Sequence, residues 1–248
     1  MKAMVLAAGQ GTRLRPITDS LPKALVPVAG RPMIDYPLLL LRHYGIGEVI
    51  INLHHLGEKI ESYLGDGARF GLKISYSREA QLLDTGGGLL KAKPFLADDT
   101  FLVINTDALI DLNLSELIAY HRRKNAAVTL VLRADENADR YGSIDIDRHG
   151  KICRFLKTQA PDAPSGPTEK LMFTGVQVLE PRVFNFMNDR PKPRKFGTTT
   201  ETYPRMLAAG EALYGFRFDG FWQDLGTPER IKDVEENFRS GRARLHYL

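Results

Sequence analysis

The chain is poor in cysteine, since Cys153 is the only one among its 248 residues. It cannot form an intramolecular disulfide, which is typical of a protein from a reducing compartment. We expect Cys153 to be a packed, structural residue. The N-terminus has one lysine and then only a short apolar run, so no signal peptide is expected. No stretch approaches the ~20 apolar residues of a membrane-spanning helix. These absences predict a cytoplasmic protein with no membrane partner.

The chain also lacks a strong excess of charge of either sign. It carries 34 Lys and Arg against 30 Asp and Glu, a formal net charge of +4. Its short basic runs, at 122–124, 192–195 and 239–244, do not resemble a nucleic-acid-binding arm. We therefore expect no nucleic-acid partner, whereas phosphate-bearing ligands would suit a mildly basic protein.

The first half of the chain alternates apolar runs with segments of helical periodicity. We predict strands at 4–7, 48–53, 73–76 and 101–105. We predict helices at 33–44, 57–64 and 85–93, the first with Pro32 in its opening turn. Repeated strand–helix–strand units indicate an α/β fold with a mostly parallel sheet and helices on both faces. Ligands bind beyond the carboxyl ends of the strands in such sheets, which points to loops 8–22 and 106–111.

The second half has shorter segments. We predict helices at 114–124, 202–209 and 227–240, strands at 127–132, 171–179 and 212–218, and a hairpin over 142–155. No repeat and no clear linker interrupts the chain. We therefore predict one domain over residues 1–248, with a mixed-sheet lid in its second half.

Two closely spaced glycines follow the first predicted strand. Gly9 and Gly11 would let main-chain N–H groups approach a polyphosphate, and Arg13 could contact phosphate through two hydrogen bonds. A tight turn would use the same glycines. Leu14 stands where a dinucleotide-binding fingerprint needs its third glycine, and no Walker A sequence is present, so neither motif fits. Lys23 follows on a backbone restrained by neighbouring prolines, although a single lysine is usually a surface charge.

The stretch LAAGQGTRLRPITDSLPKALVPVAGRPMIDY resembles the signature of the sugar-1-phosphate nucleotidyltransferase family. The resemblance implies an enzyme that joins a nucleoside triphosphate to a sugar 1-phosphate and releases pyrophosphate. It implies a Rossmann-like fold with a small β lid for the sugar phosphate. In the family the glycine loop binds the triphosphate, and an arginine and a lysine neutralise its charge. The implied nucleotide-binding residues here are Leu6, Ala8, Gly9, Gly11, Thr12, Arg13 and Lys23.

A second segment, EAQLLDTGGG at 79–88, resembles the base-binding segment of the family. Its commonest form ends in LGTAGA, and the acidic-TGGG form is closer to uridylyltransferases that act on N-acetylmuramic acid 1-phosphate. The resemblance implies that Gln81, Thr85 and the backbone around Gly86 contact the base. The residues alone also fit a helix start with Asp84 or Thr85 as the N-cap.

Two aspartates are the implied metal ligands. Asp107 follows an apolar strand, and Asp224 lies in WQDLGTPE, which resembles the W-x-D-x-GTP motif of the family. Mg²⁺ prefers one or two carboxylates together with substrate phosphates and waters. With Arg13 and Lys23, these aspartates are the implied catalytic residues. Thr106 replaces the customary glycine, which leaves the local backbone geometry open. A lone aspartate at a strand end is usually a turn or cap residue. His54 and His55 follow another predicted strand, and neighbouring residues of a strand point to opposite faces, so we expect both histidines to be structural.

The sugar-phosphate side of the resemblance is thinner, because the stretch FLKT at 155–158 lacks the Glu and Pro of the F-x-E-K-P motif. Roles for Lys157 and Glu201 therefore stay open. The implied sugar-phosphate-binding residues are Asn105, Tyr141, Gly142, Lys157, Thr174, Gly175 and Glu201. The implied halves of the domain are about 1–125 for the nucleotide and 126–248 for the sugar phosphate, with no C-terminal β-helix domain.

The substrates stay open at this point. UTP with N-acetylmuramic acid 1-phosphate is favoured by the TGGG run, while GTP with mannose or heptose 1-phosphate and TTP with glucose 1-phosphate are alternatives. A non-catalytic, nucleotide-sensing regulatory subunit is the alternative from another class. Such a subunit is expected to lack the arginine, the lysine or a metal-binding aspartate, and all four residues are present. The oligomeric state is not evident from the sequence.

Overall fold

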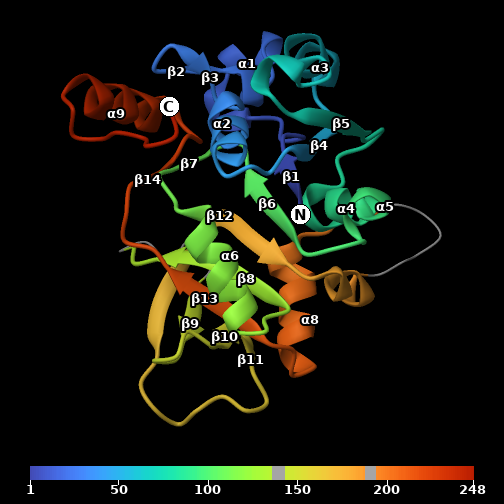
Figure 1. Ribbon diagram of the computed structural model, residues 1–248, viewed down its shortest axis with the longest axis vertical. Coiled ribbons are helices and arrows are strands. Elements are labelled where there is room, and N and C mark those ends of the chain that lie inside the picture. The colour runs from blue at the N-terminus through green and yellow to red at the C-terminus, as the bar shows by residue number, and fades with distance from the viewer. Residues whose placement is uncertain (136–142, 188–193) are drawn as a thin grey trace. The chain divides into compact units, whose positions relative to one another are not determined.

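The computed structural model describes residues 1–135, 143–187 and 194–248 (Figure 1). The chain divides into two compact units, each built from separate stretches of sequence. The first unit comprises Met1–Leu82, Ile104–Leu112 and Gly220–Leu248. The second unit comprises Leu83–Val103 and Asn113–Asp219.

A parallel sheet forms the centre of the first unit. Strands β1 (Lys2–Leu6), β4 (Glu48–Leu53) and β5 (Lys73–Arg78) pair in parallel, with Ala3 opposite Val49 (Figure 1). Strand β6 (Phe101–Asn105) runs into this unit and lies next to β1 in the strand order. The interior residues of β1 and β4 are almost fully buried, as expected for parallel strands. The predicted α/β fold with a mostly parallel sheet is confirmed.

Helices connect the strands of this sheet. Helix α2 (Asp35–His43) and helix α3 (Gly57–Leu64) follow β1 and β4 along the chain, and η3 (Ala68–Phe70) is a single turn before β5. Each helix buries an apolar stripe, with Leu38 and Leu41 of α2 and Ile60 of α3 fully buried. Among the described residues, no helix combines the length and apolar character that crossing a membrane requires.

The prediction that Pro32 opens a helix is wrong. Ala29 and Gly30 both have positive φ, at 47° and 84°, and turn the chain back on itself. As a result β3 (Arg31–Pro32) pairs antiparallel with β2 (Pro27–Val28), and α2 begins only at Asp35. The tight turn therefore takes the place of the expected first helical turn.

Several short elements and helix α9 complete the first unit. They are η1 (Thr12–Leu14), α1 (Ile17–Ser20), η2 (Lys23–Leu25), β7 (Ala108–Ile110), β14 (Trp222–Asp224) and α9 (Pro228–Arg239). Thr227 caps α9 by accepting a hydrogen bond from Arg230 N, and Pro228 occupies the first turn of this helix.

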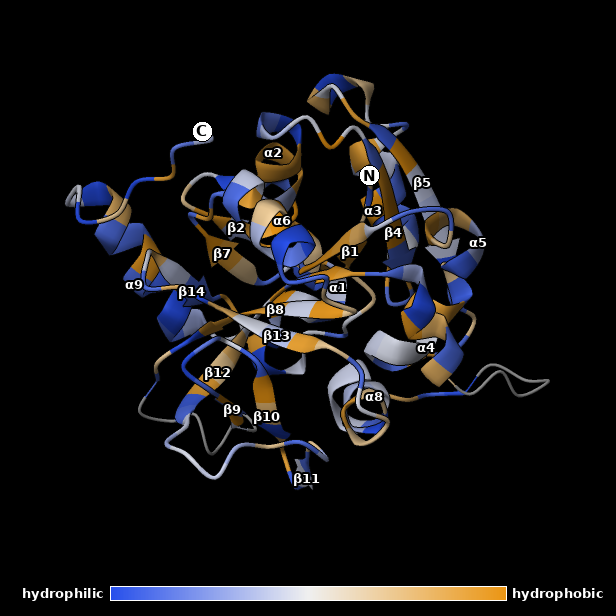
Figure 2. Ribbon diagram, turned by 60° about the horizontal axis from the view of Figure 1, so that its bottom comes forward, coloured by the Kyte–Doolittle hydropathy of each residue, from blue (hydrophilic) through white to orange (hydrophobic). Residues whose placement is uncertain are grey.

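The second unit contains a mixed sheet. Strand β12 (Glu169–Leu179) pairs antiparallel with β8 (Val128–Arg133), which in turn pairs in parallel with β13 (Leu213–Arg217). Hydrophobic residues recur along β8 and β13 (Figure 2). Beyond β12 lie β9 (Ile144–Ile146), β10 (Ile152–Phe155) and β11 (Thr158–Gln159). Strands β9 and β10 are antiparallel, which confirms the described part of the predicted hairpin. Cys153 of β10 is buried, as expected.

The helical elements of the second unit begin with α4 (Asp84–Lys91), α5 (Lys93–Leu96) and α6 (Leu114–Arg123). They continue with η4 (Pro181–Phe186), the π-helical turn η5 (Thr198–Thr202) and α8 (Tyr203–Ala208). Asn113 caps α6, because its side chain accepts from Glu116 N and donates to the Glu116 carboxylate.

Candidate active site

The glycine loop lies where β1 ends. In the part of the chain that the structure describes, the main-chain N–H groups of residues 8–11 have no hydrogen-bond acceptor. Gly9 and Gln10 are exposed to solvent. Consecutive free N–H groups attract anions, so this loop can bind the oxygens of a phosphate chain.

Gly11 allows the loop to approach Lys23. It has a left-handed backbone, with φ 65°, and a β-carbon there would lie 2.9 Å from both Lys23 Cβ and Thr18 Cγ2. Gly9 differs, because a β-carbon at that position would meet no heavy atom within 4 Å. Fold geometry thus requires glycine at position 11, whereas position 9 borders open space.

Lys23 lies against the glycine loop, where its β-carbon faces Gly11. It opens the short turn η2, and its Nζ atom lies 2.5 Å from Asp107 Oδ2. The two side chains are 15% and 29% exposed, so the ion pair is partly shielded from water. The structure therefore brings together two residues that the sequence separates by 84 positions.

Thr106 holds Asp107 against the end of β1. Its N–H and its hydroxyl both donate to the Leu6 carbonyl, at 3.2 and 2.7 Å, and its side chain is buried. Thr106 does not have a positive φ, so a side chain here causes no backbone strain. The threonine in place of the customary glycine thus adds a hydrogen bond to the strand from which the glycine loop starts.

Asp224 lies on the strand next to Asp107. In the antiparallel pair of β7 and β14, Asp224 is opposite Ala108, and Leu225 N donates to the Asp107 carbonyl at 2.9 Å. The Asp224 carboxylate accepts from Gly226 N through Oδ1 and pairs with Arg230 Nη1 through Oδ2, both at 2.5 Å. Sequence reasoning missed Arg230, although its place in the first turn of the helix after Asp224 was a usable signal.

Arg13 reaches the same end of β14. A β-carbon at Gly226 would lie 2.5 Å from Arg13 Nη2 and 2.5 Å from Asp224 Oδ1, so both side-chain ends lie against this glycine. The structure thus brings all four residues predicted to be catalytic into one cluster of the first unit. We call Arg13, Lys23, Asp107 and Asp224 the charged cluster.

The charged cluster offers carboxylates to a metal but no larger set of ligands. Among the described residues, no group of three or more His, Cys, Asp or Glu side chains is placed to hold a metal ion. Two carboxylates are nevertheless the protein ligands that Mg²⁺ takes when phosphates and waters supply the rest. Asp107 Oδ1 has no partner in the described chain, and each carboxylate oxygen can accept more than one bond. The donor set therefore fits Mg²⁺ bound together with a phosphate ligand.

The predicted base-binding segment starts α4 in the second unit. Gly86 N and Gly87 N both donate to the Phe196 carbonyl, at 2.9 and 3.2 Å. A β-carbon at Gly86 would clash with the Phe196 ring. The Thr85 hydroxyl accepts from Thr198 N at 2.9 Å. Both amides are therefore engaged within the unit, and packing against Phe196 accounts for the glycine at position 86.

The N-cap expected at Asp84 or Thr85 is wrong. Asp84 is the first residue of α4, with a left-handed φ of 62°, and the N-cap residue is Leu83, without a side-chain bond. The Asp84 side chain instead accepts from Thr85 N at 2.7 Å. The Phe196 carbonyl replaces the expected cap, because it accepts the N–H groups of the first turn. Gln81 is exposed and lies near the end of the first of the three stretches that form the first unit.

The predicted sugar-phosphate residues do not form one group as the residues of the charged cluster do. Tyr141 and Gly142 lie outside the described residues. Asn105 ends β6 and is half-buried, and Lys157 is exposed in the turn between β10 and β11. The structure leaves the predicted roles of these residues untested.

Three further sugar-phosphate candidates lie in the second unit, and two of them, Thr174 and Glu201, already have partners there. The Thr174 hydroxyl donates to the Val131 carbonyl at 2.9 Å, and Gly175, with φ 91°, lies where the β12 register shifts. Glu201 accepts two hydrogen bonds from the Arg194 guanidinium, at 2.9 and 2.5 Å. Sequence reasoning did not find Arg194 or Phe196. Phe196 contacts Gly86 and Gly87, far away along the chain, whereas Arg194 pairs with Glu201 only seven residues on.

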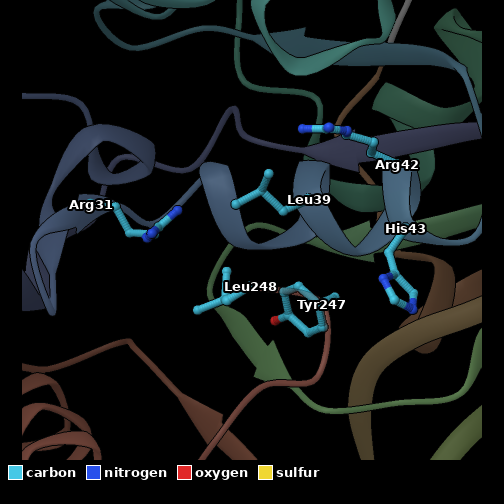
Figure 3. Close-up of a pocket in the computed structure, with 6 residues that line it drawn as sticks. All are labelled: Arg31, Leu39, Arg42, His43, Tyr247 and Leu248. Carbon is cyan, nitrogen blue, oxygen red and sulfur yellow. The ribbon is translucent and has the colours of Figure 1, made fainter.

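A pocket of about 430 Å³ opens elsewhere in the first unit, beside α2 (Figure 3). It is lined by Arg31, Leu39, Arg42, His43, Tyr247 and Leu248. None of these is a predicted site residue, so the pocket does not contribute to the candidate active site.

Comparisons with known proteins identify the family of the chain. The family model described as nucleotidyl transferase matches residues 2–241. The chain is 37% identical to UTP–glucose-1-phosphate uridylyltransferase of a Synechocystis strain, covering 91% of this chain and 60% of that protein. It is 35% identical to mannose-1-phosphate guanylyltransferase of Mycobacterium tuberculosis, covering 92% and 61%. The chain thus spans about three fifths of the length of these relatives.

Another relative matches over nearly its whole length. N-acetylmuramate alpha-1-phosphate uridylyltransferase of Neisseria meningitidis serogroup B is 34% identical, covering 95% of this chain and 97% of that protein. Among solved structures, a putative glucose-1-phosphate thymidylyltransferase from Bacillus anthracis has the same fold. Its TM-score is 0.81 at 24% identity, with 96% of this chain and 95% of that one covered.

Proposed function

Because the chain belongs to the nucleotidyl transferase family, we propose that it joins a nucleoside triphosphate to a sugar 1-phosphate and releases pyrophosphate. The observation that carries this proposal is the charged cluster beside the glycine loop, with Lys23 Nζ 2.5 Å from Asp107 Oδ2. A regulatory subunit without activity is disfavoured, since all four residues of the cluster are retained.

The reaction needs positioning more than covalent chemistry. A phosphate oxygen of the sugar 1-phosphate attacks the α-phosphorus of the triphosphate, and the bond to the leaving pyrophosphate breaks. We assign the free N–H groups of residues 8–11 and the Arg13 guanidinium to the β- and γ-phosphates. Lys23 stabilises the charge that develops near the α-phosphorus. The enzyme thereby holds two anionic substrates in line.

Charge balance supports a role for a metal. Nucleotidyl transferases generally use a divalent metal ion. Lys23 and Arg230 each pair with one carboxylate of the cluster, which leaves Arg13 to offset a triphosphate of much greater charge. Asp107 and Asp224 would hold Mg²⁺, which when bound supplies positive charge at the phosphates. The two aspartates thus serve as its protein ligands.

For the substrates, we propose UTP and N-acetylmuramic acid 1-phosphate. The LDTGGG run resembles that group of uridylyltransferases, and relatives from Neisseria and Synechocystis are named as enzymes that use uridylyl donors. GTP with mannose or heptose 1-phosphate and TTP with glucose 1-phosphate are the competing pairs. Other relatives are named as guanylyltransferases, so the base has to be decided by experiment.

A matrix of triphosphates against sugar 1-phosphates, read by pyrophosphate release with Mg²⁺ present, tests the proposal. We expect the highest kcat/KM with UTP and N-acetylmuramic acid 1-phosphate, and loss of release in Asp107→Asn. Higher turnover with another pair would overturn the substrates and leave the reaction class standing. Absence of pyrophosphate with every pair would overturn the reaction class.

A further inference from the structure

Asn52 lies in β4, and His55 lies in the turn that follows this strand. Asn52 contacts Ala7, just before the glycine loop, and His55 contacts Thr18, which bonds to Gly11. We propose that Asn52 and His55 are positioning residues that hold this loop in the shape that binds the triphosphate. The inference rests on the proposed function, because it assigns these residues a role in nucleotide binding.

Asn52 anchors the entry to the loop. Its Oδ1 atom accepts from Ala7 N, and its Nδ2 atom donates to Glu79 Oε1, both at 2.8 Å. Asn52 and Glu79 are only 3% and 5% exposed. Because a carboxylate only accepts hydrogen bonds, Glu79 fixes the orientation of the amide, and the amide oxygen must then face Ala7. The chain that leaves β1 is thereby tied to β4 and to the residue after β5.

His55 and Thr18 anchor the exit from the loop. The Thr18 hydroxyl donates to the Gly11 carbonyl at 2.9 Å, and His55 Nε2 lies 3.1 Å from the Thr18 carbonyl. A carbonyl oxygen only accepts, so Nε2 must carry a proton and donate. Thr18 is 1% exposed, and its methyl group packs against Gly11. The exit is thus fixed by a chain of contacts from His55 through Thr18 to Gly11.

Between these two anchors lie the four consecutive N–H groups that have no acceptor in the described chain. Donors that are already oriented bind an anion without the free-energy cost of reordering the loop. Burying the Glu79 carboxylate costs free energy that an apolar core residue would not. We therefore attribute the buried network of Asn52 and Glu79 to the need to hold the glycine loop in one shape, and not to packing alone.

Asn52 can be tested by a reciprocal exchange. In Asn52→Asp, a second carboxylate faces Glu79, and we expect the KM for UTP to rise about tenfold or more. The KM for the sugar 1-phosphate and kcat change much less, because the anchor acts on the triphosphate loop. Adding Glu79→Gln restores the pairing, since the introduced amide donates to the introduced carboxylate. The double variant is expected within about threefold of the wild type.

His55 can be tested by keeping or removing its donor. His55→Gln retains an N–H group that can reach the Thr18 carbonyl, and we expect near-normal KM for UTP. His55→Leu removes the donor and leaves the carbonyl unpaired, so we expect a rise of about fivefold. Hydrogen exchange of residues 7–14 without ligand provides a second readout, which we expect to quicken in Asn52→Asp and His55→Leu.

Tyr203→Phe is the matched control. It removes a buried hydrogen bond of 2.5 Å to Gln177 in the second unit, so it tests loss of stability alone. We expect a lower melting temperature with unchanged KM for UTP and unchanged exchange at 7–14. The inference is overturned if Asn52→Asp and His55→Leu behave like this control, or if Glu79→Gln fails to rescue Asn52→Asp. If no substrate pair gives pyrophosphate, the proposed function fails, and exchange at 7–14 alone decides whether the anchors hold the loop.

Discussion

Gly9 and Gly11 belong to one loop but have different reasons to be glycine. At Gly11 the backbone is left-handed and a β-carbon would press on Lys23 and Thr18. At Gly9 a β-carbon would enter open space, where we place the phosphates. The first glycine is therefore assigned to the ligand and the second to the fold.

This difference predicts distinct phenotypes for two similar substitutions. We expect Gly11→Ala to lose about 1–3 kcal/mol of stability because of backbone strain, as measured by urea unfolding. Gly9→Ala should unfold like the wild type but show a KM for the triphosphate raised by about tenfold, since the methyl group intrudes on the ligand. Normal KM in a stable Gly9→Ala variant would contradict the placement of phosphates at this loop.

Lys23 has both a partner in the fold and an assigned role in catalysis. We expect Lys23→Ala to lower kcat/KM by about 100-fold or more, the usual cost of losing one electrostatic stabiliser. Its loss also leaves the partly shielded Asp107 carboxylate without its cation. Lys23→Met keeps much of the side-chain volume and separates the charge effect from packing. Turnover close to wild type in either variant, with saturating Mg²⁺, would remove Lys23 from the mechanism.

At the scale of elements, the start of α4 and the segment at Phe196 fit only as a pair. The Phe196 ring fills the space that a β-carbon at Gly86 would need, and its carbonyl caps the helix. We expect Gly86→Ala to destabilise the protein and Phe196→Ala to create a cavity that costs about 3–5 kcal/mol. The double variant should lose less stability than the sum of the two, because the cavity admits the methyl group. Additive losses in urea unfolding would show that the clash does not occur.

A second pair of elements is joined by a buried histidine. His121 of α6 contacts the Thr129 hydroxyl through Nδ1 and Glu180 Oε1 through Nε2, at 2.8 and 3.1 Å. Burial lowers the pKa of His121 below its ordinary value, and the nearby Glu180 only partly opposes this shift. The histidine is therefore neutral in the folded protein near neutral pH.

The lowered pKa predicts acid sensitivity. When the pH falls below the ordinary histidine value, the unfolded chain binds a proton at His121 and the folded chain resists it. Stability contributed by this site is thus complete above that value and declines as the pH falls toward the lowered pKa. Urea unfolding at several pH values between about 5 and 8 measures the slope. We expect a shallower slope in His121→Gln, and an unchanged slope would contradict the assignment.

The elements show how far the sequence could be interpreted. Apolar runs and helical periodicity were sufficient to predict β4, α3 and the hairpin of β9 and β10. The predictions failed at two places with positive φ, namely Ala29 and Gly30 just before Pro32, and Asp84 itself. Hydrophobic periodicity carries no information on this angle. At the site, the resemblance to the family's motifs predicted the four residues of the charged cluster, which local patterns alone did not distinguish from turn, cap or surface residues. Local patterns also could not indicate Asn52, whose partner Ala7 lies 45 residues away, because such contacts depend on the register of the sheet.

At the scale of the whole molecule, the chain returns twice to the unit that carries the charged cluster. Arg13 and Lys23 come from the first stretch of this unit, Asp107 from the second and Asp224 from the third. Binding of a triphosphate and Mg²⁺ at the cluster would therefore link all three stretches in the folded state and in no unfolded one. A ligand of this kind stabilises the protein by mass action.

This linkage gives a test that does not depend on turnover. With UTP and Mg²⁺ at about 100 times the dissociation constant, we expect about 2.7 kcal/mol of added stability. For a chain of this size that corresponds to a rise in Tm of about 5–11 °C. A chelator should remove most of the rise while leaving the Tm of the ligand-free protein unchanged, and Asp107→Asn should abolish the metal-dependent part. A rise of the same size with the chelator present would show that the nucleotide binds without a metal held by these aspartates.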